Sequence, residues 1–121
     1  MKKILIIDDD YEIREILNIF LTKNKFITEI AEDLAAAKEK LHSFGPDLIL
    51  LDMHLPDGDG IDFLKIINEQ KIDSHVIMVT GVTDKEIALQ ALEMGASDYI
   101  TKPIDLQYLN TSIIAKLLTT F

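Results

Sequence analysis

The chain has 121 residues, of which 48% are apolar, and a formal net charge of −9. This length suits one compact domain, and the apolar fraction excludes an acidic disordered tail. The negative charge argues against direct nucleic-acid binding, because phosphate backbones attract basic surfaces. The absence of cysteine excludes disulfides and thiolate metal sites.

No targeting or membrane segment is apparent. Residues 4–7 are apolar, but this run is too short for the core of a signal peptide. No later apolar run approaches the length of a membrane span. We therefore expect a single domain over residues 1–121, located in the cytoplasm and without membrane contact.

Strand-like and helix-like patterns alternate from the first residues onward. Residues 2–7 predict a buried strand, and a helix follows whose apolar face runs through residues 13–21. Asp10 is the expected N-cap of that helix. Residues 26–31 predict a weaker strand, and the spacing in 34–44 predicts a second helix, ended by a Gly-Pro pair.

The second half repeats the alternation. Residues 48–51 form an unbroken apolar run, typical of a central parallel strand covered on both faces. Thr83 and Glu86 have the spacing of a capping box. The remaining predicted elements are a loop over 53–60, a helix over 61–68, a strand over 76–80, a helix over 83–94, a strand around 99–100 and a helix over 106–117.

Strands that alternate with helices predict right-handed crossovers and a parallel sheet. Five such units account for the whole chain. The predicted fold is α/β: a flavodoxin-like (βα)5 doubly wound sheet of five parallel strands with helices on both faces.

Polar residues follow the predicted strands at their carboxyl ends, where ligands bind in such sheets. Asp8 and Asp9 follow the first strand, and Asp52 follows the third. Thr80 ends the fourth strand, and the fifth leads to Lys102. We therefore expect three carboxylates, a hydroxyl and an ammonium to meet at one edge of the sheet.

Crowded carboxylates repel one another unless a cation lies between them. Ligand sets made only of oxygen atoms suit Mg²⁺, which also binds phosphate groups. A carboxylate can accept a phosphoryl group covalently, and a lysine and a hydroxyl can stabilise the transferring group. The pattern therefore indicates Mg²⁺-dependent phosphoryl chemistry.

The sequence resembles a response-regulator receiver domain over essentially its whole length. The resemblance is carried by the segments ILIIDD at 4–9, DLILLDMHLP at 47–56, Thr-Gly at 80–81 and Lys-Pro at 102–103. Each motif alone is weak, but the set at these spacings is specific.

The resemblance implies a role for each of these residues. Asp52 would be the phosphoacceptor, and Asp9, assisted by Asp8, would bind Mg²⁺ together with Asp52 and the backbone carbonyl of His54. Lys102 would contact the phosphoryl group, before a Pro103 whose peptide bond is often cis in the family. Two further roles concern switching and lifetime: Thr80 and Tyr99 would be the switch pair, and the apolar Val82 would favour a long-lived acyl phosphate.

The resemblance also implies partners. A sensor histidine kinase or a histidine phosphotransfer protein would donate the phosphoryl group. The chain would catalyse its own phosphorylation and slow dephosphorylation, as a switch and not as a turnover enzyme. An output surface over residues 84–118 would then act on an output domain or a downstream protein. A homodimer is a further possible assembly.

Two other functions are compatible with parts of the sequence. Asp8 and Asp10 also resemble the nucleophile and acid–base pair of haloacid-dehalogenase-type phosphatases, although no acidic pair follows the lysine. A binding module that kept the fold but lost phosphorylation is the third interpretation. The complete set of acidic residues with Thr80 and Lys102 argues against it.

Overall fold

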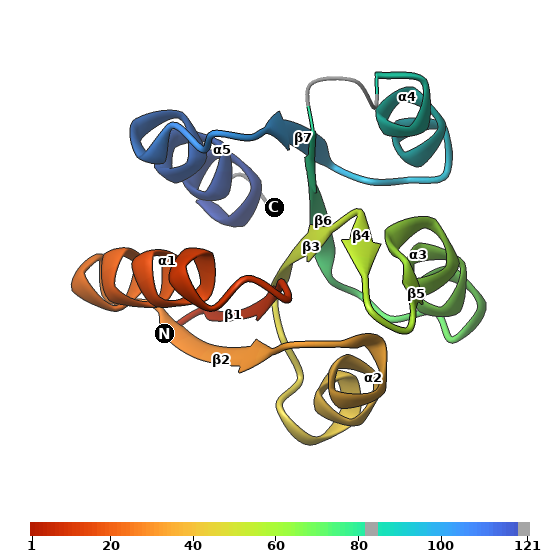
Figure 1. Cartoon of the computed structure of the whole chain (residues 1–121). Coiled ribbons are helices and arrows are strands. Elements are labelled where there is room, and N and C mark those ends of the chain that lie inside the picture. Colours follow the sequence, from red (N-terminus) through yellow and green to blue (C-terminus); the bar gives the residue numbers. More distant parts are fainter. Residues whose placement is uncertain (82–84, 119–121) are drawn as a thin grey trace.

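A five-stranded parallel sheet forms the centre of the molecule. The structure is a computed structural model and describes residues 1–81 and 85–118 (Figure 1). The strands follow the order β2-β1-β3-β6-β7. Their bounds are β1 Lys3–Ile7, β2 Ile27–Ala31, β3 Leu48–Asp52, β6 His75–Thr80 and β7 Asp98–Thr101. All neighbouring strands pair in parallel, which confirms the predicted flavodoxin-like doubly wound sheet.

Helices cover both faces of this sheet, as predicted (Figure 1). Helix α1 (Tyr11–Lys23) and helix α5 (Leu106–Leu118) lie on one face. Helices α2 (Leu34–Ser43), α3 (Gly60–Glu69) and α4 (Lys85–Glu93) lie on the other. None of the helices in the described part of the chain is long and apolar enough to cross a membrane.

The central strand β3 is buried over its full length. Leu48 and Leu50 pack in the cluster that includes residues of α1 and α5, whereas Ile49 and Leu51 pack in the cluster of the other face. Burying each such side chain contributes about 2 kcal/mol of hydrophobic free energy. The four apolar residues 48–51 of β3 therefore help to hold the helices of both layers to the sheet.

Helix α1 starts as the sequence predicts, but its buried face differs in one position. The Asp10 side chain accepts hydrogen bonds from the backbone N–H groups of Glu12 and Ile13, so its predicted capping role is confirmed. Ile16, which shares the apolar face of the helix, is 55% exposed. Arg14 is buried instead.

The predicted loop over residues 53–60 contains a small hairpin that the sequence does not indicate. Strand β4 (His54–Leu55) pairs antiparallel with strand β5 (Gly58–Asp59), and α3 begins directly after it. Two-residue strands are too short to show any alternation of polar and apolar residues. The predictions for Val82 and for a helix cap at Thr83 fall outside the described residues.

Candidate functional site

Three aspartates meet where β1 and β3 end side by side. The register pairs Ile7 with Leu51, so the residues that follow this pair, Asp8 and Asp52, reach the same edge of the sheet. One carboxylate oxygen from each of Asp8, Asp9 and Asp52 can be chosen so that all lie within 4.8 Å of one another. Asp8 and Asp52 are buried, whereas Asp9 is exposed. The predicted convergence of the three carboxylates is therefore present in the structure.

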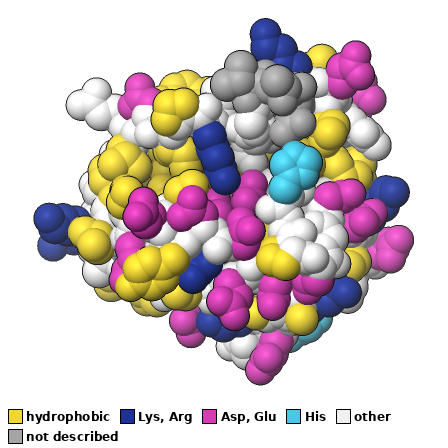
Figure 2. Space-filling view, in the orientation of Figure 1, with side chains coloured by type: hydrophobic (Ala, Val, Ile, Leu, Met, Phe, Trp, Pro, Cys, Tyr) yellow, Lys and Arg dark blue, Asp and Glu magenta, His cyan; other side chains and the backbone are white. Residues whose placement is uncertain are grey.

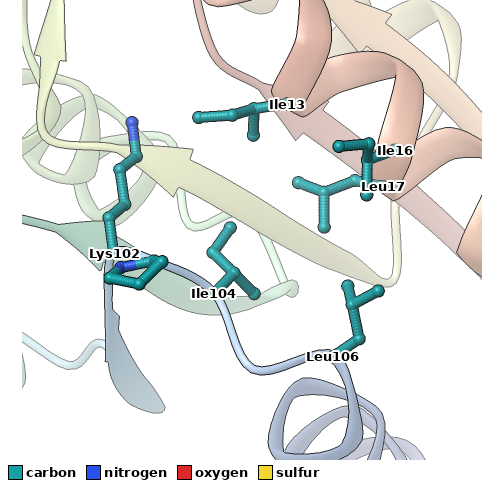
Figure 3. Close-up of a pocket in the computed structure, with 7 residues that line it drawn as sticks. Ile13, Ile16, Leu17, Lys102, Ile104 and Leu106 are labelled. Atoms are coloured by element: carbon teal, nitrogen blue, oxygen red, sulfur yellow. The ribbon is translucent and has the colours of Figure 1, made fainter.

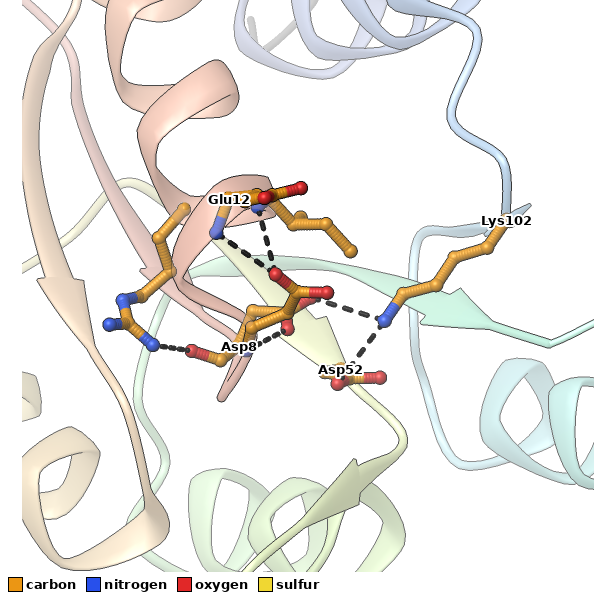
Figure 4. A network of polar contacts seen from close by, with 7 residues as sticks. Asp8, Glu12, Asp52 and Lys102 are labelled. Atoms are coloured by element: carbon orange, nitrogen blue, oxygen red, sulfur yellow. Dashed lines mark hydrogen bonds and ion pairs between the residues drawn. The ribbon is translucent and has the colours of Figure 1, made fainter.

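Lys102 connects two of these aspartates. Its Nζ atom lies 3.3 Å from Oδ2 of Asp8 and 3.4 Å from Oδ2 of Asp52. Figure 4 shows its side chain extending from the segment after β7 to both carboxylates. The peptide bond between Lys102 and Pro103 is cis, as the resemblance implies. The ammonium thus offsets part of the repulsion between two buried negative charges.

The surroundings favour the protonated form of Asp52. Burial, followed by the nearby charge of Asp8, raises the pKa of Asp52 from 3.8 to about 6. Lys102 and a hydrogen bond from the backbone of His54 act in the opposite direction. Burial opposes the charge of Lys102, but the carboxylates of Asp52 and Asp8 raise the pKa of Lys102 overall. A second cation in this site would therefore stabilise the ionised form of Asp52.

The loop between β1 and α1 is held by contacts that sequence reasoning missed. The Nη1 atom of Arg14 donates a 2.8 Å hydrogen bond to the backbone oxygen of Asp8. The backbone N–H of Asp10 donates one of 2.9 Å to Oδ1 of Asp8. A signal for Arg14 was present, since it lies three residues before Leu17 and seven before Leu21, on the buried stripe.

The remaining predicted residues lie around this cluster at different depths. Thr80 is 1% exposed at the end of β6, and its backbone oxygen accepts a 2.8 Å hydrogen bond from the N–H of Lys102. Tyr99 lies in β7 and is half-buried against the core. His54 begins β4 with an exposed side chain, next to the Asp52 carboxylate that its backbone contacts.

The donor set has the chemistry of a site for a hard divalent cation. Carboxylate oxygens are preferred by Mg²⁺, and an exposed carboxylate such as Asp9 leaves room for the water molecules that this ion retains. Acidic side chains are also spread over the surface around this edge of the sheet (Figure 2). The residues present therefore fit Mg²⁺.

An apolar groove with a volume of about 410 Å³ adjoins the cluster. Ile13, Ile16 and Leu17 of α1 form one wall, and Ile104 and the first residue of α5, Leu106, form the other (Figure 3). Pro103 and Lys102 also line the groove. The groove therefore places apolar surface beside the acidic cluster, since Lys102 belongs to both.

Comparison with protein families matches residues 4–114 to the response regulator receiver domain. Among curated proteins, the chain is 42% identical over 105 residues to the response regulator protein PilR of Pseudomonas aeruginosa, covering 87% of this chain and 24% of PilR. It is 41% identical over 104 residues to the phosphate regulon transcriptional regulatory protein PhoB of Escherichia coli, covering 84% of this chain and 45% of PhoB. The chain thus spans less than half the length of these relatives.

Solved structures match the chain over nearly its full length. A two-component response regulator from Clostridium difficile superposes with a TM-score of 0.91 at 32% identity, covering 98% of each chain. The receiver domain of NtrX from Brucella abortus gives a TM-score of 0.90 at 30% identity, covering 97% of this chain and 99% of the other.

Proposed function

The chain belongs to the response-regulator receiver domain family, and from this premise we propose that Asp52 accepts a phosphoryl group from a phosphohistidine. Members of this family act as phosphorylation switches. The relatives are named as response regulators, and one solved relative is named as a two-component response regulator. The observation that supports the proposal best is the meeting of Asp8, Asp9 and Asp52 with Lys102 at the end of the central strand.

In the proposed reaction, an oxygen of the ionised Asp52 attacks the phosphorus of the donor. The N–P bond of the phosphohistidine breaks, its electron pair leaves with the imidazole, and an acyl phosphate forms on Asp52. Lys102, which already contacts Asp52, would bind a phosphoryl oxygen. Asp8, Asp9, Asp52 and the carbonyl of His54 would hold Mg²⁺, which supplies positive charge against the phosphoryl oxygens when bound.

Hydrolysis would reverse the modification. A water molecule would attack the phosphorus, the acyl P–O bond would break, and Asp52 and inorganic phosphate would be regenerated. This makes the chain a catalyst of its own modification and demodification. Phosphorylation would bias two conformations through Thr80, buried beside the site, and Tyr99, one strand further along.

The proposed readout surface comprises α4, β7 and α5. These elements follow β6, whose last residue, Thr80, pairs with Thr101 of β7. The relatives are longer than this chain, so we propose that an output domain or a separate downstream protein receives the signal. A sensor histidine kinase or a histidine phosphotransfer protein in the cytoplasm would donate the phosphoryl group. The proposal also includes association of two copies of the chain in a homodimer.

The haloacid-dehalogenase interpretation is not supported. The family and the relatives are those of receiver domains, and the Asp10 side chain is occupied as the cap of α1. In that interpretation the acyl phosphate would form on Asp8, whereas here it forms on Asp52. Peptide mapping of the phosphorylated chain distinguishes modification at Asp8 from modification at Asp52.

The test is to incubate the chain with acetyl phosphate and Mg²⁺, trap the acyl phosphate by borohydride reduction and locate it by mass spectrometry. We expect modification at Asp52, none in Asp52→Asn, and none after chelation of the metal. Modification at Asp8, or undiminished modification in Asp52→Asn, would contradict the proposal.

A further inference from the structure

Asp57 lies at the tip of the β4–β5 hairpin and reaches a helix elsewhere in the chain. Its Oδ1 atom accepts a 2.8 Å hydrogen bond from the backbone N–H of Leu34, and its Oδ2 atom accepts one of 3.0 Å from that of Ala35. Both N–H groups belong to the first turn of α2, where no partner within the helix is available. One carboxylate therefore connects the hairpin to the start of α2 by two bonds.

Further observations show that this contact is close. The pKa of Asp57 is lowered from its ordinary value, and the hydrogen bond from the backbone N–H of Leu34 is the largest cause. A Cβ atom on the neighbouring Gly58 would lie 2.6 Å from Cδ1 of Leu34, so any larger residue there would force the Leu34 side chain to move. The helix already has a conventional cap, because Asp33 accepts a 2.8 Å hydrogen bond from Ala36. The Asp57 contact is thus additional to the cap that α2 needs.

The other end of the same hairpin lies in the functional site. His54 follows Asp52 by two residues, pairs with Asp59, and contacts the Asp52 carboxylate through its backbone. At the base of the hairpin, the N–H of Gly60 donates a 2.8 Å hydrogen bond to the oxygen of Met53. A two-stranded hairpin this short has little stability of its own. Its geometry next to Asp52 therefore depends on what holds its tip.

We propose that Asp57 is a positioning residue, which anchors the β4–β5 hairpin to α2 and thereby fixes the backbone of His54 beside Asp52. The inference rests on the proposed function in one respect, because that function makes the carbonyl of His54 a ligand of Mg²⁺. Residues that orient metal ligands typically change the metal affinity 10- to 100-fold when they are removed. Loss of the anchor should therefore weaken Mg²⁺ binding without removing any ligand.

Asp33 provides a matched control for this experiment. Asp57→Ala and Asp33→Ala each remove one carboxylate, with the same charge, from the start of α2. Only Asp57→Ala releases the hairpin. Asp57→Asn serves as the conservative variant, since its single side-chain oxygen can accept one of the two hydrogen bonds.

The experiment measures the Mg²⁺ dissociation constant of the whole chain by calorimetry and backbone amide exchange of the metal-free chain by NMR. We expect Asp57→Ala to raise the dissociation constant about tenfold or more, Asp57→Asn to lie between it and the wild type, and Asp33→Ala to stay within about twofold of the wild type. Exchange of the amides in residues 54–59 should accelerate in Asp57→Ala and not in Asp33→Ala.

Equal Mg²⁺ affinity in the Asp57 and Asp33 variants would overturn the inference. If the wild type itself bound no Mg²⁺, the proposed function would fail, and the anchor would be judged by amide exchange alone. Faster exchange at residues 54–59 only in the Asp57 variants would then support it, and unchanged exchange would overturn it. Should Asp57→Ala fail to fold, Asp57→Asn carries the same comparison.

Discussion

At the scale of single residues, the acidic cluster is held together by Lys102. Its ammonium lies within 3.4 Å of both buried carboxylates, yet the pKa of Asp52 is still raised to about 6, first by burial and then by Asp8. The metal-free site is therefore electrostatically unfavourable for an ionised Asp52. Such a residue can be stabilised either by a proton or by a divalent cation.

This leads to a prediction on stability against pH. Because the pKa of Asp52 is raised from 3.8 to about 6, the folded chain keeps a proton that the unfolded chain has lost between these values. The free energy of unfolding should fall as the pH rises through this window, by at most about 3 kcal/mol. Asp52→Asn, which cannot ionise, should therefore be more stable than the wild type above about pH 6.

Urea unfolding in a chelator, across about pH 3 to 8, measures this difference. The curves of the two proteins should approach each other as the pH falls below 3.8, where Asp52 becomes protonated in the unfolded state as well as in the folded state. Lys102 keeps Asp8 as a partner in the variant, so the comparison does not leave its charge isolated. A difference that does not depend on pH would contradict the prediction.

Some residues of the site could be predicted from the sequence and others could not. Asp8, Asp52 and Lys102 stand at the carboxyl ends of β1, β3 and β7, so the topology of a parallel sheet is enough to bring them together. Asp57 falls in the predicted loop over residues 53–60, and the sequence indicates no further role for it. Its contact with α2 spans 23 positions and depends on how a loop folds, which no local pattern encodes.

At the scale of elements, α1 depends on its first turn. Asp10 accepts hydrogen bonds from two backbone N–H groups that have no partner within the helix. Asp10→Ala should therefore lower the free energy of unfolding by about 1 kcal/mol. Phosphorylation of Asp52 by acetyl phosphate should persist, because we assign Asp10 no ligand or acid–base role.

Thermal or urea unfolding measures the first effect, and phosphoprotein mass spectrometry measures the second. Asp10→Asn is the matched control, since asparagine caps helices about as well as aspartate and should retain most of the stability. Loss of acyl phosphate formation in both variants would point to a chemical role for Asp10 and against the present assignment.

The elements themselves were predictable where a long pattern supports them. The continuous apolar run of β3 follows from burial of that strand on both faces of the sheet. The 3.6-residue spacing of apolar residues in α1 follows from burial of one face of the helix. The hairpin of β4 and β5 was missed, since each strand has only two residues and is defined by pairing alone. The apolar spacing of α1 also did not separate Ile16, which lines a groove, from the buried Leu17.

At the scale of the whole molecule, a switch must connect the site to distant elements. Thr80 is suited to this because it is buried at the end of β6, and β6 lies between β3 and β7. We expect Thr80→Ala to accept the phosphoryl group but to transmit less of the change to β7 and α5. Thr80→Ser keeps a hydroxyl and should transmit it.

Amide spectra of the chain before and after addition of acetyl phosphate and Mg²⁺ measure this transmission. In the wild type and in Thr80→Ser, the resonances of α4, β7 and α5 should shift, and in Thr80→Ala these shifts should be smaller at equal phosphorylation. Equal shifts in all three proteins would show that the hydroxyl of Thr80 has no part in the switch.

The place of Asp52 in the sheet also has a consequence for the direction of signalling. Strand β3 is paired on both edges, with β1 and with β6, and is covered on both faces. Segments of this kind open only in the rarest fluctuations of a protein. A new group on Asp52 therefore cannot be accommodated by yielding of the strand that bears it. The displacement has to be taken up at the periphery, in the connections beyond the strand ends, where a binding partner can detect it.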